Sequence, residues 1–169
     1  GGFSRYSVDN YWLVPHFEKM LYDNALLARV YLHAWQITKE QRWRNVAEET
    51  IDYVLRRLIQ PGGGFASAED ADSEGVEGLY YVWTVDQINE ICGLNSPAVL
   101  DWYGVTEQGN FEGANILYRP VRGDLLRPPE IEQARQDLLN VREGRIRPGL
   151  DDKVLTEWNG LMLTTLAEA

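Results

Sequence analysis

Two neighbouring stretches with different apolar patterns constrain the fold most. From 17 to 37, apolar residues fall on nearly every face of a helix, whereas from 41 to 59 they form one stripe. The first pattern is typical of a helix enclosed on all sides, and the second of a helix with one face in water. Because only Thr38-Lys39-Glu40 separates them, they predict an αα-hairpin over 17–59, an inner helix followed by an outer one.

The same alternation returns near the other end of the chain. Pro128 and Pro129 begin an expected outer helix over 128–143, and the stretch 153–169 has the pattern of another inner helix. Gly2-Phe3 and Gly64-Phe65 also repeat, each at a place where a helix is expected to have ended. Helical hairpins of this kind bury their core only when they stack on neighbours. We therefore expect residues 1–169 to be one partial domain, a fragment of a larger ring of α-hairpins.

A long irregular region, 61–127, separates the hairpins. In chain order we expect a strand at 78–83, a short helix that begins at the capping box Thr84-Val85-Asp86-Gln87 and ends at Gly93, a helix from Ser96 to Gly104, and a segment at 115–118 paired with the strand. A connection of this length is uncommon in a compact helical domain unless it is functional. This region is the first indication of a site.

Charge and composition narrow the classes of function. The net charge of −10 opposes nucleic-acid binding, which depends on Lys and Arg neutralising phosphates. No run approaches the roughly 20 apolar residues that a membrane span needs, so we expect no membrane partner. The first residues lack the order of a signal peptide, which indicates a cytoplasmic protein or one whose start has been removed; we expect the cytoplasm. A single cysteine, Cys92, provides neither a disulfide framework nor a cysteine zinc site.

The first polar segment spans 9–20 and includes Asp9 and Trp12. Pro15 places His16 at the expected beginning of the inner helix, next to Glu18. An imidazole beside a carboxylate suits general acid–base chemistry. The alternative is that His16 caps the helix or packs under Trp12, and that Glu18 only complements the helix dipole. We expect His33, inside the same helix, to be a core residue.

The second polar segment, 68–78, contains five acids. Asp70-x-Asp72-x-Glu74-Gly75 matches the opening of a calcium-binding loop, but Tyr81 stands where the bidentate Glu is required. We therefore predict no metal and no cofactor. Two other interpretations remain open: carboxylates that bind sugar hydroxyls, one of them acting as acid or base, or a solvated loop.

The third segment, 149–160, places Asp151 and Asp152 beside Lys153 at the start of an inner helix. If the inner helices begin at one rim of a ring, this segment meets His16 and Asp70 there; the alternative is helix capping by Asp151 or Asp152. A fourth polar loop spans 109–115. We predict His16, Asp70 and Asp152 as catalytic, and Asp9, Trp12, Glu18, Glu69, Asp72, Tyr80, Trp83, Glu112, Asp151, Lys153, Trp158 and Asn159 as substrate-binding.

Four long motifs carry a family resemblance that covers essentially the whole chain. They are Val14-Pro15-His16-Phe17-Glu18-Lys19-Met20-Leu21-Tyr22-Asp23-Asn24-Ala25, Ser67-Ala68-Glu69-Asp70-Ala71-Asp72-Ser73-Glu74, Gly109-Asn110-Phe111-Glu112-Gly113 followed by Asn115-Ile116-Leu117, and Asp151-Asp152-Lys153 followed by Leu155-Thr156 and Trp158-Asn159-Gly160-Leu161-Met162. The chain resembles the thioredoxin-domain-containing proteins of the spermatogenesis-associated family. The resemblance implies a thioredoxin-like domain in the parent protein, followed by an (α/α)6 toroid of the six-hairpin glycosidase type, similar to N-acylglucosamine 2-epimerases. On this resemblance we expect the chain to be a fragment that omits the thioredoxin part and the remaining hairpins.

These observations favour a mainly α fold and a carbohydrate-active function. We expect a small polar ligand, a sugar, and a parent enzyme that is a sugar epimerase or isomerase or a glycoside hydrolase, the fragment itself being inactive. The alternative is a non-catalytic recognition module that acts with the thioredoxin-like domain. Apolar faces of 17–37 and 153–169 that lack neighbours are expected to make the fragment self-associate.

Overall fold

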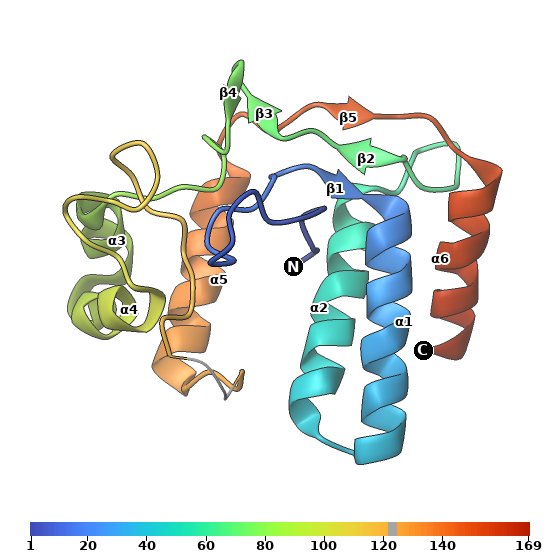
Figure 1. Ribbon diagram of the computed structural model, residues 1–169, viewed down its shortest axis with the longest axis horizontal. Helices are drawn as coiled ribbons and strands as arrows, with labels where there is room; N and C mark the ends of the chain where they lie inside the picture. Colours follow the sequence, from blue (N-terminus) through green and yellow to red (C-terminus); the bar gives the residue numbers. More distant parts are fainter. Residues whose placement is uncertain (122–124) are drawn as a thin grey trace. The chain divides into compact units, whose positions relative to one another are not determined.

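The computed structural model describes residues 1–121 and 125–169, and these fall into two units. The first unit contains 1–7, 15–72 and 148–169, and the second contains 8–14 and 73–147. Within the expected irregular region 61–127, residues 122–124 lie outside the described residues. The described chain is mainly helical with small strands (Figure 1). The six-hairpin toroid, and the assignment of 1–169 to a single partial domain, stay predictions.

Three helices carry the first unit: α1 (Leu21–Thr38), α2 (Gln41–Arg57) and α6 (Thr156–Glu168). Figure 1 shows α1 and α2 as an antiparallel hairpin. Their shared core includes Leu21, Ala25, Tyr53, Val54, Leu58, Phe65 and Met162. Burial of such side chains contributes roughly 1.5–3 kcal/mol each, so the apolar stripe of α2 determines which of its faces packs inward.

α1 is not enclosed on all sides, contrary to the sequence-based expectation. Leu26, Val30 and Ile37 are exposed, because α2 and α6 cover only part of its circumference in the described chain. His33 is also exposed, and its Nε2 lies 2.7 Å from Glu168 Oε2. The expectation that His33 belongs to the core is therefore wrong.

A three-stranded antiparallel sheet lies at the beginning of α1. Its order is β1 (Lys19–Met20), β2 (Ala68–Glu69) and β5 (Leu150–Asp151). The backbone of 17–20 is extended, and Leu21 N donates to Ser67 O at 2.9 Å. The helix therefore begins four residues later than expected, because Lys19 and Met20 pair with β2 rather than with the next helical turn.

Two asparagines hold repeated Gly-Phe segments in the first unit. Asn24 Oδ1 accepts from Phe3 N at 2.6 Å, and Asn24 Nδ2 donates to Phe3 O at 3.2 Å. Asn159 makes the same pair of bonds to Phe65, at 2.7 and 3.0 Å. We call these arrangements the Phe3 clamp and the Phe65 clamp. They give a structural meaning to the repetition of Gly-Phe in the sequence.

The second unit contains α3 (Val85–Cys92), a 3-10 turn (Gly93–Asn95), α4 (Ser96–Tyr103) and α5 (Pro129–Glu143). β3 (Asp72–Ser73) and β4 (Val76–Glu77) form a two-stranded sheet. The core of this unit includes Trp83, Ile88, Val99, Ile131, Ala134 and Leu138.

In this unit the predicted helix boundaries are confirmed, but the predicted strand is not. The capping box of Thr84 and Gln87 is confirmed, as is the end of α4 at Gly104. The predicted strand 78–83 is wrong: its first residues form a turn in which Tyr81 N donates to Gly78 O. The predicted pairing with 115–118 is reduced to a single bridge between Trp83 and Asn115.

None of the helices in residues 1–121 and 125–169 combines the length and the apolar character that crossing a bilayer requires.

Candidate functional site

The sheet of the first unit joins parts of the first, second and third polar segments. Lys19 lies opposite Glu69, and Glu69 opposite Leu150, while Ala68 lies opposite Asp151. Beyond the paired strands, Asp70 N donates to Gly149 O at 2.8 Å. Figure 1 shows β1 leading into α1 and the chain after β5 leading into α6. The beginnings of both helices are therefore held at one sheet.

A group of ionisable side chains lies just before and after β1. We call His16, Glu18 and Asp23 the His16 cluster. His16 Nδ1 lies 3.9 Å from Glu18 Oε2, and Glu18 Oε2 also accepts from Arg5 Nη1 at 3.1 Å. The His16 ring stacks on Tyr6 with 4.8 Å between ring centroids.

Backbone bonds determine where His16 lies. His16 N donates to Tyr6 O at 2.8 Å, and Arg5 N donates to Glu18 O at 2.9 Å. His16 therefore precedes β1 and belongs to a pair of extended segments. The prediction that it lies at the beginning of the helix is wrong, because β1 separates it from α1.

Two buried atoms of the cluster lack partners. His16 Nδ1 and Asp23 Oδ2 are shielded from solvent, and neither has a hydrogen-bond partner among the described residues. Leaving a buried polar atom unsatisfied costs roughly 1–3 kcal/mol, so native structures rarely do so without a reason. Such atoms are candidates for contact with a ligand.

Burial raises the pKa of the Asp23 carboxyl. The charge of Arg5 and a hydrogen bond from Tyr22 act against this shift, whereas the charge of Glu18 adds to it. An aspartate whose pKa is raised carries a proton at higher pH than usual, which is what a general acid requires. Glu18, whose charge acts on Asp23, also lies 3.9 Å from His16 Nδ1, so the cluster combines a carboxyl of raised pKa with an imidazole.

The predicted acids at the edge of the sheet are exposed. Asp70 Oδ1 accepts from Ala71 N at 2.6 Å, and Asp72 lies in β3. Asp151 Oδ1 pairs with Lys153 Nζ at 2.9 Å, and the hydrogen bond from Lys153 is the main cause that lowers the pKa of Asp151. Asp152 is exposed. The roles predicted for these residues stay predictions.

Two other predicted ligand contacts in the first unit have internal partners. Glu69 is 2% exposed; its carboxylate accepts from Tyr53 Oη at 2.8 Å and from Arg57 Nε at 2.6 Å. Asn159 is committed to the Phe65 clamp. These bonds disfavour the predicted role of either residue in substrate binding. Trp158 is half-buried and lies edge-on against Tyr22, with 4.8 Å between centroids.

Asp9 and Trp12 belong to a loop of the second unit. The Asp9 carboxylate accepts from the backbone N–H groups of Tyr11, Leu13 and Val14, and the bond from Val14 is the main cause that lowers the pKa of Asp9. Trp12 is 82% exposed and has a left-handed backbone, φ 62°. Asp9 thus shapes the loop, while Trp12 remains available for a stacking contact.

Tyr80, Trp83 and Glu112 also lie in the second unit. Tyr80 and Trp83 are buried, so they offer little ring surface for the predicted stacking on a sugar. Glu112 is exposed in a turn, with φ 47°. These three residues therefore belong to a different unit from the His16 cluster.

Sequence reasoning missed Asp23, Arg5 and Tyr6. Asp23 carried a usable signal, because it is an acid in the first turn of a helix whose other faces are mostly apolar. Arg5 and Tyr6 carried none, since their contact with His16 and Glu18 depends on backbone pairing between separate segments.

In the described part of the chain, no three His, Cys, Asp or Glu side chains gather closely enough to hold a metal ion. The residues that match a calcium loop instead form β3 and a tight turn. Glu74 and Gly75 in this turn have φ 55° and 77°, which connects β3 to β4.

Comparison with known proteins gives long matches at moderate identity. No known family profile matches the chain. Human and mouse spermatogenesis-associated protein 20 are each 37% identical to it, over 98% of this chain and 26% of the relative. An uncharacterized protein of Caenorhabditis elegans is 31% identical over 99% of this chain and 28% of the relative. The chain thus spans about a quarter of the length of the curated relatives it matches, and these matches support the resemblance seen in the motifs.

Proposed function

With the similarity to the spermatogenesis-associated protein 20 family as the premise, we propose that the chain is the sugar-binding part of a carbohydrate-active domain. In this proposal the parent protein has a thioredoxin-like domain and an (α/α)6 toroid similar to N-acylglucosamine 2-epimerases. The His16 cluster contacts the sugar, and the reaction is epimerisation or isomerisation by proton transfer.

The pair of unsatisfied buried atoms carries this proposal. His16 Nδ1 and Asp23 Oδ2 require partners that the described chain does not supply, and a sugar offers hydroxyl groups that donate and accept. Removal of a proton from the carbon beside a carbonyl requires a base, and the carbonyl oxygen requires an acid. His16 acts as the base, and Asp23, whose pKa is raised by burial, acts as the acid.

Glu18 positions the base in this scheme. Its carboxylate lies between the guanidinium of Arg5 and the His16 ring, so it can stabilise the imidazolium that forms when the base takes a proton. The stacked ring of Tyr6 limits rotation of the imidazole. Both contacts support an oriented rather than a freely moving histidine.

The test is proton NMR of the full-length protein in heavy water with a panel of reducing monosaccharides and glycosidically linked oligosaccharides. Exchange of one ring proton for deuterium is expected, lost in His16→Gln and at least about tenfold slower in Asp23→Asn. The matched controls are His33→Gln and Asp52→Asn, which change an exposed histidine on α1 and an exposed acid on α2; both should keep the activity.

The same spectra distinguish epimerisation from glycoside hydrolysis and from a non-catalytic recognition module. New anomeric signals without exchange would replace this proposal with hydrolysis by Asp70 and Asp152. Silence across the panel, with wild-type and control proteins folded, would favour a recognition module that acts with the thioredoxin-like domain.

We also propose that the 169-residue chain by itself is inactive, self-associates and is cytoplasmic. Leu26 and Val30 on α1 and Leu163 on α6 are exposed apolar side chains of the first unit, and such surfaces favour association. Sedimentation velocity should show a mass that rises with concentration, less so in Val30→Glu. A strictly monomeric profile would contradict self-association, and cell fractionation tests the location.

A further inference from the structure

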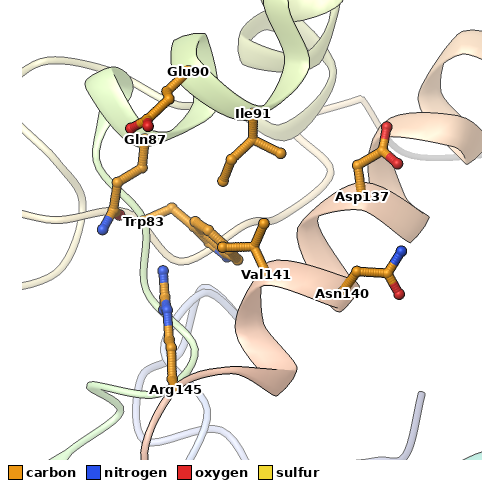
Figure 2. A pocket seen from close by; sticks show the side chains of 8 residues that line it. All are labelled: Trp83, Gln87, Glu90, Ile91, Asp137, Asn140, Val141 and Arg145. Atoms are coloured by element: carbon orange, nitrogen blue, oxygen red, sulfur yellow. The ribbon is translucent and has the colours of Figure 1, made fainter.

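A groove in the second unit runs beside α3 and α5 (Figure 2). Its volume is about 590 Å³, and a second hollow of about 490 Å³ shares Trp83, Gln87 and Arg145 with it. These three residues therefore mark the place where the two hollows meet. Volumes of this size are in the range of small-molecule sites.

Arg145 is held rigidly at this place without a carboxylate partner. Its Nη1 donates to Tyr80 O at 2.9 Å and to Val82 O at 2.8 Å, and the guanidinium lies 3.9 Å from the centroid of the Trp83 ring. No acid pairs with it among residues 1–121 and 125–169. Partly buried charges are ordinarily paired, so a counter-charge is missing.

A second arginine strengthens the positive potential. Burial lowers the pKa of Arg145, and the charge of Arg142 lowers it further. The Arg142 guanidinium lies 5.5 Å from the ring centroids of both Tyr80 and Tyr81, and its buried Nε has no hydrogen-bond partner in the described chain. The two guanidinium groups carry the same charge and repel each other, so a bound anion would stabilise both.

The capping box aims a further donor into the groove. Gln87 Oε1 accepts from Thr84 N at 3.0 Å, so the amide is oriented and its Nε2 is directed elsewhere. That nitrogen has no partner within the described residues. In Figure 2, the Gln87 amide nitrogen and the Arg145 guanidinium point toward one another. Gln87 Nε2 and the guanidinium of Arg145 therefore face each other, and the acceptors of Arg145 are the backbone carbonyls of Tyr80 and Val82, both bonded through Nη1.

We propose that this groove binds a small ligand with a carboxylate or phosphate group, held between Gln87 Nε2 and the remaining N–H groups of Arg145. The planar guanidinium presents parallel donors that match both oxyanions. Glu90 and Asp137 line the groove beyond this point, so the rest of the ligand carries hydroxyl or ammonium groups rather than a second anion. The proposal does not depend on the His16 cluster, which lies in the other unit.

The test uses Gln87→Glu in the full chain. Glutamate retains the oxygen that accepts from Thr84 N and so preserves the capping box, but replaces the donor nitrogen with a charged oxygen. Inorganic phosphate and acetate are titrated at constant ionic strength while ¹H–¹⁵N signals of Arg145 Nε and the Gln87 amide are followed. We expect saturable shifts in the wild type and affinity at least about tenfold weaker in Gln87→Glu.

Gln41→Glu is the matched control, with the same change of charge on α2 of the first unit, and it should bind as the wild type does. Arg145→Lys retains the charge but loses the forked donors, and binding should be lost; if this variant does not fold, Gln87→Glu decides.

Binding of phosphate alone or acetate alone would support the proposal and identify the oxyanion. Absence of saturable shifts, or equal affinity in Gln87→Glu and Gln41→Glu, would overturn it.

Discussion

The Phe3 clamp and the Phe65 clamp are built from the same bonds but lie in different surroundings. Besides holding its Phe, each asparagine donates to the carbonyl four residues earlier, Met20 O at 2.8 Å or Leu155 O at 3.0 Å. The glycines before the two Phe residues have φ of 80° and 78°. One local solution has therefore been used twice, wherever an extended segment crosses the beginning of a helix.

Their surroundings differ in two ways. Both bonds of the Phe65 clamp are buried, whereas those of the Phe3 clamp are partly buried. A Cβ on Gly2 would lie 2.3 Å from the buried Tyr53 ring, whereas a Cβ on Gly64 would lie 2.8 Å from the exposed Val154 side chain. A repeated motif therefore has no fixed stability, because its neighbours determine how much each copy contributes.

Removal of either clamp asparagine is expected to cause the largest loss of stability among the variants considered. Asn159→Ala should lower the free energy of unfolding by about 3 kcal/mol and Asn24→Ala by about 2 kcal/mol, because lost bonds leave buried backbone groups unsatisfied. The smaller value reflects water that can replace the bonds to Phe3. Urea denaturation of both variants measures the difference, and equal losses would contradict the role assigned to burial.

Substitution of the glycines should have the opposite ranking, with the larger loss of stability at the Phe3 clamp. Gly2→Ala should destabilise by about 2 kcal/mol and Gly64→Ala by about 1 kcal/mol, since both carry the strain of a left-handed alanine but only Gly2 faces a buried ring. The same denaturation experiment applies. A larger loss for Gly64→Ala would show that Val154 cannot move aside.

Glu168 on α6 connects this helix to α1, and these two helices carry the clamp asparagines. It accepts from Arg29 and approaches His33, and hydrogen bonding to Arg29 first and to His33 second lowers its pKa from 4.5 to about 2. A depressed carboxylate pKa contributes stability above pH 4.5, and this contribution is lost as the pH falls through 2.

Stability measured between pH 5 and pH 2 should therefore fall more steeply in the wild type than in Glu168→Gln. This loss of stability should be smaller than those expected for the asparagine and glycine variants, because the Arg29–Glu168 pair is exposed to solvent. Glu157→Gln, at the other end of α6, is a control that should keep the wild-type slope. Identical slopes in all three proteins would exclude a link between α1 and α6 through Glu168.

Local patterns predicted the helices better than the site. The stripe of α2, the capping box at Thr84 and the end of α4 at Gly104 each depend on residues within a few positions of one another. The aromatic run at 78–83 misled, because strand propensity depends on a partner and only Trp83 has one. His16 was selected for chemistry, but Asp23, whose unsatisfied oxygen distinguishes it, was not.

Sequence patterns alone predicted the αα-hairpin, the repeated Gly-Phe segments and the polar segments that include His16. The tertiary structure alone decided that Lys19 and Met20 form a strand, that Glu69 is buried while His33 is exposed, and that Arg145 lacks a counter-charge. The difference arises from how far apart in the sequence the interacting residues lie. Helices and caps depend on hydrogen bonds between neighbours in the chain, whereas strand pairing, burial and charge balance depend on residues brought together by folding.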